Sequence, residues 1–264
     1  MNPIIDYYSR FDEWGRLDRE PLEFTINWHY MTQYLPTSGT VLDNGAGPGK
    51  YSMELAKLGY NVTLSDITPK LVEIAEEKAS ELGLTEQFSG FHVLNATHLE
   101  GVPSEIFDAS LMLGPLYHLQ NEEDRKSAVR ELFRVTKKNG IVFVAFQSRM
   151  RMTLTSLQFP QHWKPNDNLD SINQFYEQGI FDHHDKGRFT GAYYFHMDEI
   201  KPFMESNGLV IPLSSRQMKK AMLPARIDTQ SVRVFSVWFE TVGSYKSKYN
   251  LPRLDECQFL IYTV

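Results

Sequence analysis

The chain has 264 residues, of which 42% are hydrophobic and 23% are charged. These are the proportions of an ordinary soluble protein, and the length suffices for one domain with a full core and an inserted lid. A formal net charge of −6 argues against a nucleic-acid partner, because phosphate binding needs a concentrated basic surface. The one cysteine, Cys257, excludes an internal disulfide and a cysteine-rich metal site, and we expect no metal.

The sequence gives no sign of a membrane-spanning segment or a signal peptide. No apolar run is long enough to span a bilayer, and the first residues are too short and too polar for a signal peptide. We therefore expect a cytoplasmic protein with no membrane partner. The oligomeric state stays open between a monomer and a homodimer.

The first part of the chain predicts a helical cap followed by a regular core. Residues 1–35 contain a helix-like stretch at 21–34, which we interpret as an N-terminal cap. Strand-like and helix-like stretches then alternate over 39–147, which is typical of a parallel sheet covered by helices. The expected strands lie at 41–42, 61–65, 91–94, 107–113 and 141–146.

The helices between these strands carry clear end signals. Thr68 followed by Pro69 is typical of a helix start, and Gly83 of its end. Acidic residues after Asn121 favour another helix N-terminus, and we expect that helix to close at residues 137–140.

The rest of the chain departs from the alternation. Residues 151–197 predict a lid, with a helical segment around Ile172 and a hairpin around 185–187. Residues 198–264 are expected to complete the sheet, with helical spacing at 235–249 and a final strand at 258–264. We thus expect a single domain made of cap, core, lid and C-terminal completion.

The most informative stretch is 41–51, where a short buried strand leads through a glycine-rich turn into a helix. Gly45, Gly47 and Gly49 alternate with other residues, so a ligand can lie against bare peptide groups. Asp66 ends the second strand, and an acid there can accept hydrogen bonds from ribose hydroxyls. The pair predicts a nucleoside site, although a glycine turn with no ligand uses the same residues.

With Asp43 before its first glycine, this turn resembles the first motif of the class I S-adenosylmethionine-dependent methyltransferases. The resemblance covers residues 39–147 and, more loosely, the C-terminal part. It implies a Rossmann-like α/β fold with a seven-stranded, mostly parallel sheet of order 3-2-1-4-5-7-6, whose last strand is antiparallel. It also implies S-adenosyl-L-methionine as cofactor and S-adenosyl-L-homocysteine as product.

By this resemblance, the residues after strands one to four hold the cofactor. Gly45 and Gly47 would pass the methionine part, with Tyr8 the favoured ligand of its carboxylate among Tyr7, Tyr8, Arg16 and Arg19. Adenine would lie against Ile67 and receive a hydrogen bond from the Ala96 backbone, and the Asn95 carbonyl would accept from its amino group, although Asn95 also suits a plain turn. Asp43 would orient the glycine turn or bind the ammonium. The full expected set is Tyr8, Asp43, Gly45, Ala46, Gly47, Asp66, Ile67, Asn95, Ala96 and Leu113.

The string 113–119, LGPLYHL, is similar to that of bacterial small-molecule methyltransferases and lies where the family places its acceptor-facing loop. His118 and Tyr117 are the expected catalytic residues, and both are expected to bind the substrate. His118 is the candidate base or acceptor anchor and Tyr117 lines the pocket, whereas a purely structural histidine is the other interpretation. In the aromatic lid, Tyr194 and His184 are further candidates for substrate binding. The stretch lacks the Asn/Asp-Pro-Pro-aromatic motif of adenine-methylating DNA enzymes.

These observations predict methyl transfer to an N or O nucleophile of a small molecule or small peptide. Two alternatives remain. A nicotinamide-dependent oxidoreductase shares the strand, glycine turn and acid, although its turn usually has the form G-x-G-x-x-G. A module that binds S-adenosylmethionine without turnover is excluded poorly, since methyl transfer requires no single essential side chain.

Overall fold

The computed structural model describes residues 2–19, 21–158, 168–181, 191–208 and 259–263. The chain divides into two units, of which the first comprises Met1–Val210 and Cys257–Val264. The second, Ile211–Glu256, lies outside the described residues, together with the helix expected at 235–249. All the described helices and strands therefore belong to the first unit.

The first unit has an α/β fold. The described strands of its central sheet run in the order β3-β2-β1-β4-β5-β8. Five neighbouring strands are parallel: β3 (Phe88–Val93), β2 (Asn61–Asp66), β1 (Thr40–Asn44), β4 (Phe107–Met112) and β5 (Thr136–Ala145). β8 (Phe259–Thr263) pairs antiparallel with β5, as expected for the last strand. The remaining strand of the predicted seven would fall within 209–258, which the structure does not describe.

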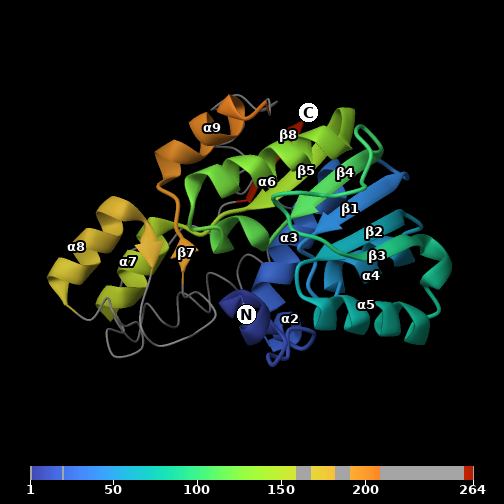
Figure 1. Cartoon of the computed structure of the whole chain (residues 1–264), viewed down its shortest axis with the longest axis horizontal. Helices are drawn as coiled ribbons and strands as arrows, with labels where there is room; N and C mark the ends of the chain where they lie inside the picture. The colour runs from blue at the N-terminus through green and yellow to red at the C-terminus, as the bar shows by residue number, and fades with distance from the viewer. Residues whose placement is uncertain (1, 20, 159–167, 182–190, 209–258, 264) are drawn as a thin grey trace, which may run out of the picture. The chain divides into compact units, whose positions relative to one another are not determined.

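Helices cover both faces of this sheet. Figure 1 shows α4 (Lys50–Lys57) and α5 (Pro69–Glu81) on one face and α6 (Glu122–Val135) on the other. This is the doubly wound arrangement, in which the direction of winding reverses beside β1. Val41 and Leu42 in β1 are fully buried, because the first strand of such a sheet has helices on both sides.

Local sequence explains where two of these helices begin. Pro69 occupies the first turn of α5 after the cap residue Thr68, as predicted. The side chain of Asn121 caps α6 by accepting hydrogen bonds from the backbone N–H groups of Glu123 and Asp124.

The expected end of α6 is wrong. The helix stops at Val135, and Thr136 already pairs with Phe107 as the first residue of β5. The register then shifts, so that Ile141 is the next residue in line, opposite Ala109. The polar residues 137–140 form this irregularity, in which Asn139 has a φ of 62°. Their residue types are those of a helix end, but in the structure they bulge from a strand.

The N-terminal cap is helical. It consists of α1 (Pro3–Tyr8), α2 (Arg16–Arg19) and α3 (Pro21–Tyr34), the last with the predicted bounds. Leu17 and Met31 from this cap are buried against β1 and α4 residues in one core cluster. A short 3-10 turn, η1 (Thr85–Gln87), precedes β3, and a second, η2 (Pro115–His118), follows β4.

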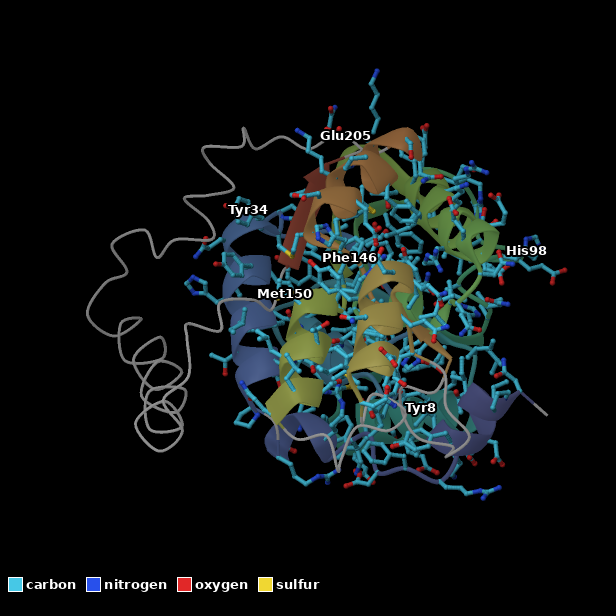
Figure 2. All side chains as sticks on the ribbon, turned by 90° about the vertical axis from the view of Figure 1, so that its left-hand side faces the viewer. Tyr8, Tyr34, His98, Phe146, Met150 and Glu205 are labelled. Carbon is cyan, nitrogen blue, oxygen red and sulfur yellow. The ribbon has the colours of Figure 1, made fainter. Side chains whose placement is uncertain are left out.

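The described residues after β5, from Arg149 to Ser206, form a small layer of their own, which we call the lid layer. It contains α7 (Arg149–Gln158), α8 (Leu169–Gln178), the strand pair β6 (Ile180–Phe181) and β7 (Ala192–Tyr193), and α9 (Met197–Ser206). Figure 2 shows α7 and α8 side by side, with the labelled Met150 at the start of α7. The predicted helix around Ile172 is confirmed, whereas the tip of the predicted hairpin lies outside the described residues. None of the described helices combines the length and apolar character that crossing a bilayer requires.

Candidate functional site

A pocket of about 470 Å³ opens at the carboxyl ends of the central strands. Pockets of this size suit a small ligand such as a nucleoside derivative, and open α/β sheets bind ligands at this edge. Loops after β1, β2, β3 and β4 all contribute walls, and α1 and α2 close another side. Every cofactor-site residue expected from sequence lines this pocket: Tyr8, Asp43, Gly45, Ala46, Gly47, Asp66, Ile67, Asn95, Ala96 and Leu113.

The glycine turn after β1 serves packing at one position and the pocket at another. Gly45 has a φ of 72°, and a Cβ on it would lie 1.9 Å from the Cγ of Pro115, so the turn packs directly on the loop after β4. Gly47 has a φ of 58°, but a Cβ there would meet nothing closer than 3.5 Å. A methyl group at Gly47 would therefore make ordinary contact with Glu13 and Leu71 without displacing them, so the backbone conformation is the main restriction at this position of the pocket wall.

Asp66, at the end of β2, joins this turn to α5. Its carboxylate accepts hydrogen bonds from the backbone N–H of Gly47 at 2.9 Å and of Thr68 at 2.8 Å. Burial raises the pKa of Asp66, while the two backbone donors act in the opposite direction. Each carboxylate oxygen has two acceptor positions, so the side chain can still accept hydrogen bonds from a ligand in the pocket.

Asp43, in β1, lies deeper and is only 2% exposed. The hydroxyl of Ser52 in α4 donates to its Oδ2 at 2.6 Å, which fixes the carboxylate behind the glycine turn. Burial raises the pKa of Asp43 to about 6, and the nearby charge of Asp66 adds to the effect. Two buried carboxylates this close to one pocket favour a ligand that brings a positive charge.

Arg16 in α2 supplies a buried cation on the opposite wall. Its guanidinium donates to Glu13, and to both carboxylate oxygens of Glu23 at 2.7 and 3.0 Å. Burial alone lowers the pKa of Arg16, but the bonds to Glu23 and Glu13 outweigh burial and raise it above its usual value. Sequence reasoning named Arg16 as a candidate but missed both glutamates, because their pairing depends on how α2 folds against α3.

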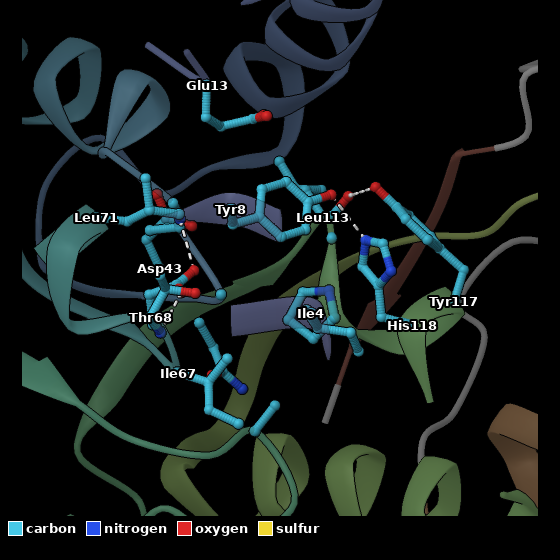
Figure 3. Close-up of a pocket in the computed structure, with 18 of the residues that line it drawn as sticks. Ile4, Tyr8, Glu13, Asp43, Ile67, Thr68, Leu71, Leu113, Tyr117 and His118 are labelled. Carbon is cyan, nitrogen blue, oxygen red and sulfur yellow. Dashed lines mark hydrogen bonds between the residues drawn. The ribbon is translucent and has the colours of Figure 1, made fainter. Parts of the chain in front are cut away.

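Tyr8, Tyr117 and His118 meet at the other end of the pocket. The Tyr8 hydroxyl and His118 Nε2 are hydrogen-bonded at 3.0 Å, and their rings meet edge to face with centroids 5.5 Å apart. Tyr117 stands beside His118 with a centroid separation of 4.8 Å, and its hydroxyl donates to the Leu113 carbonyl at 3.4 Å. Figure 3 shows Tyr117 and His118 on the right and Asp43 and Ile67 on the left, with Tyr8 between them.

The residues after β3 form the remaining wall. Ala96 is buried, whereas Asn95 is exposed and its Oδ1 accepts the Thr97 backbone N–H at 3.0 Å. That bond is the plain turn geometry that the sequence also allowed for Asn95. A ligand that donates to Asn95 Oδ1 would therefore have to share this oxygen with the Thr97 N–H.

Tyr194, one of the two lid candidates, does not join this group. Tyr194 is 3% exposed and packs with Met152, Phe175 and Phe181 in a core internal to the lid layer. It is absent from the residues that line the pocket. His184 lies outside the described residues. Alternation on so short a strand could not reveal which aromatic side chains face inward.

Residues 42–144 match a family model described as a methyltransferase domain. Over this region the chain is thus similar to methyltransferases, in agreement with the resemblance to the class I S-adenosylmethionine-dependent family. The chain is 25% identical to a malonyl-[acyl-carrier protein] O-methyltransferase of Salmonella typhimurium over 218 residues, which are 80% of the chain and 79% of the relative. It is 32% identical to an Arabidopsis thaliana tRNA (carboxymethyluridine(34)-5-O)-methyltransferase over 42% of the chain.

Solved structures of methyltransferases share the fold. A Methanosarcina mazei S-adenosylmethionine-dependent methyltransferase superposes with a TM-score of 0.53 at 24% identity, over 70% of this chain and 85% of that one. Magnesium protoporphyrin IX methyltransferase from Synechocystis, solved with bound S-adenosylhomocysteine, gives a TM-score of 0.51 at 23% identity, over 74% of this chain and 75% of that one.

Coverage of the curated relatives is uneven. The chain spans 24% of the Arabidopsis protein, and 44% of a putative methyltransferase of Geobacillus that is 29% identical over 42% of this chain.

Proposed function

We propose that the protein transfers a methyl group from S-adenosyl-L-methionine to an N or O nucleophile of a small molecule or small peptide. The observation that carries the proposal is the buried carboxylate of Asp66 beside Gly47, in a pocket that ends at Tyr8, Tyr117 and His118. One part of this pocket suits a nucleoside, and the other provides a polar, aromatic place for an acceptor.

The residues present fit the cofactor. Asp66 would accept from the ribose hydroxyls, and Ile67 and the Ala96 backbone would border the adenine. The amino-acid part would pass Gly47 in the pocket wall, where Asp43 offers negative charge for its ammonium and Arg16 is a buried cation for its carboxylate. We thus favour Arg16 over Tyr8 for the carboxylate, because a guanidinium bonds a carboxylate more strongly than a neutral hydroxyl does; Arg16 would have to share its donors between this carboxylate and Glu23.

When bound, S-adenosylmethionine supplies an activated methyl group on a sulfonium sulfur. The protein then has to align the acceptor and exclude water. Tyr8 and Tyr117 would wall the acceptor, and Nε2 of His118 would take the acceptor's proton once the Tyr8 hydroxyl yields its place. Aromatic faces beside this position also suit a cationic sulfonium or an amine.

Charge supports a small acceptor over a nucleic acid. Among the described pocket residues the two strongly basic side chains are Arg16 and Lys50, and both form ion pairs: Arg16 with Glu13 and Glu23, Lys50 with Asp18. No described lysine or arginine of the pocket is thus available for a phosphate backbone without first leaving its carboxylate.

Isothermal titration calorimetry with S-adenosylhomocysteine and with NADH tests the cofactor. We expect saturable binding of S-adenosylhomocysteine and none of NADH; the reverse would support an oxidoreductase and reject the proposal. Transfer of labelled methyl groups to a panel of amines, alcohols and short peptides then tests turnover. Binding of S-adenosylhomocysteine without transfer to any panel member would favour a non-catalytic module.

A further inference from the structure

Arg125 in α6 lies between the His118 turn and the lid layer, and nothing in the sequence singled it out. Its side chain is 5% exposed. One guanidinium nitrogen, Nη1, donates to the backbone carbonyls of Leu119 at 2.9 Å and Gln120 at 2.7 Å. These two residues directly follow His118 and themselves line the pocket. The arginine therefore fixes the backbone at the point where the His118 turn ends.

The face of the same guanidinium is covered by the lid layer. Its central carbon lies 3.5 Å from the ring centroid of Tyr193 in β7, and 5.7 Å from that of Phe195. Stacking of arginine on an aromatic face combines dispersion with attraction between the cation and the ring. The edge of one planar group thus binds the pocket loop while its face binds β7.

Tyr193 is in turn held from behind. Its hydroxyl donates to Glu199 Oε1 at 2.9 Å and accepts from Arg149 Nη2 at 3.0 Å. Arg149 also bonds the carboxylate of Glu199 and the backbone carbonyls of Tyr176 and Glu177 at the end of α8. The ring against Arg125 is consequently anchored to α7, α8 and α9 together.

We propose that Arg125 is a positioning residue that sets the orientation of His118 and transmits to it the state of the β6–β7 pair. Its importance for catalysis rests on the proposed function, because His118 is there the acceptor-side base. The lid layer would thereby influence the acceptor end of the pocket although Tyr194 itself packs in the lid core. Tyr193, rather than Tyr194, is the lid residue that acts on the site.

A lysine at this position would keep the charge but lose the planar fork and the stacking face. Arg125→Lys therefore isolates the geometry from the charge. A matched control exists on the same helix: Arg134 also donates to two loop carbonyls, those of Leu99 and Val102, far along α6 from the His118 turn. Arg134→Lys perturbs a comparable clamp that the proposal does not connect to His118.

The readout is the imidazole nitrogen spectrum of His118 in the full chain saturated with S-adenosylhomocysteine, assigned by loss of its signal in His118→Gln. Tyr8→Phe gives the reference for a lost Tyr8–His118 hydrogen bond. We expect Arg125→Lys and Tyr193→Leu to move the His118 Nε2 resonance most of the way to that reference. Arg134→Lys should leave the resonance in place, because Arg134 clamps a different loop.

An unmoved His118 resonance in Arg125→Lys would overturn the proposal, as would an equal movement in Arg134→Lys, which would mean that α6 had merely loosened. Should Arg125→Lys fail to fold, Tyr193→Leu decides alone. Calorimetry on Arg125→Lys, Tyr193→Leu and Arg134→Lys should show affinities for S-adenosylhomocysteine within about threefold of the wild type, since none of these three residues lines the pocket. Absence of binding in the wild-type chain would contradict the proposed function, while the comparison of His118 spectra without ligand would still test Arg125.

Discussion

Asp66 joins the glycine turn after β1 to the start of α5 through one buried carboxylate. Because its oxygens already accept two backbone N–H groups, a ligand bound at Asp66 would meet an acceptor held at a fixed position. The residue thus has a structural task that was not visible in the sequence, where only its place after the second strand pointed to a ribose. A mutational test of Asp66 therefore has to distinguish loss of ligand binding from loss of its bonds to the backbone of Gly47 and Thr68.

We predict that Asp66→Ala weakens S-adenosylhomocysteine binding by about 1.5–3 kcal/mol, through loss of charge-assisted hydrogen bonds. Calorimetry measures the change. The control is Asp108→Ala, since Asp108 likewise accepts a backbone N–H, from Thr40, but at the start of β4 and away from the pocket. Equal losses of affinity in the two variants, or none in Asp66→Ala, would remove Asp66 from the site.

Asp43 gives a prediction about pH. Its folded-state pKa of about 6 lies above the ordinary value of 3.8, so the folded chain holds this proton more tightly than the unfolded chain. The free energy of unfolding therefore falls as pH rises from about 4 to 6. Above pH 6 it is lower than below pH 4 by on the order of 3 kcal/mol because of this group.

Asp43→Asn removes that deficit and can keep the bond from Ser52. We expect the variant to have the higher free energy of unfolding at neutral pH and a flatter dependence on pH between about 4 and 6. Urea denaturation across this range measures both. A variant that is less stable than the wild type at neutral pH would show that Asp43 carries its charge without cost.

His118 is predicted to matter for turnover and not for the cofactor. With an acceptor identified from the panel, His118→Ala should lower kcat by about a hundredfold, as expected for loss of a general base. The dissociation constant for S-adenosylhomocysteine should change little. Normal turnover with that acceptor would reduce His118 to a structural partner of Tyr8.

At the scale of elements, the glycine turn between β1 and α4 separates packing from binding. Gly45→Ala and Gly47→Ala both place a side chain at positive φ, which costs about 1–2 kcal/mol. Gly45→Ala additionally drives a methyl group into Pro115, and overpacking of this kind costs a further ~1–3 kcal/mol. Denaturant unfolding should rank Gly45→Ala below Gly47→Ala; the opposite order would contradict the packing described for the turn.

Elements with strong local signals could be predicted, and those fixed by tertiary contacts could not. Pro69 and Asn121 mark helix starts wherever the helix packs, so α5 and α6 begin as expected. Residues 137–140 carry the lysines and glycine of a helix end, yet they bulge from β5, because pairing of Thr136 with Phe107 ends the helix earlier. Pairing between strands has no signature within so short a segment.

For the molecule as a whole, the parallel order of the five central strands and the antiparallel last strand followed from alternation and from the resemblance. That the expected cofactor-site residues would line one pocket was predictable for the same reason, since strand tips converge in any such sheet. The Arg16 cluster and the Arg125 contacts were not, because each joins segments that meet only after folding. Tyr194 was expected at the acceptor but packs inside the lid layer.

The central claim is that the tips of β1 to β4 hold a nucleoside and direct its reactive end toward Tyr8, Tyr117 and His118. A crystal structure of the complex with S-adenosylhomocysteine tests this most directly. The account predicts ribose hydroxyls on Asp66, adenine beside Ile67, and the sulfur facing the Tyr8–His118 pair. Ligand bound elsewhere, or bound here with its sulfur turned away from His118, would contradict it.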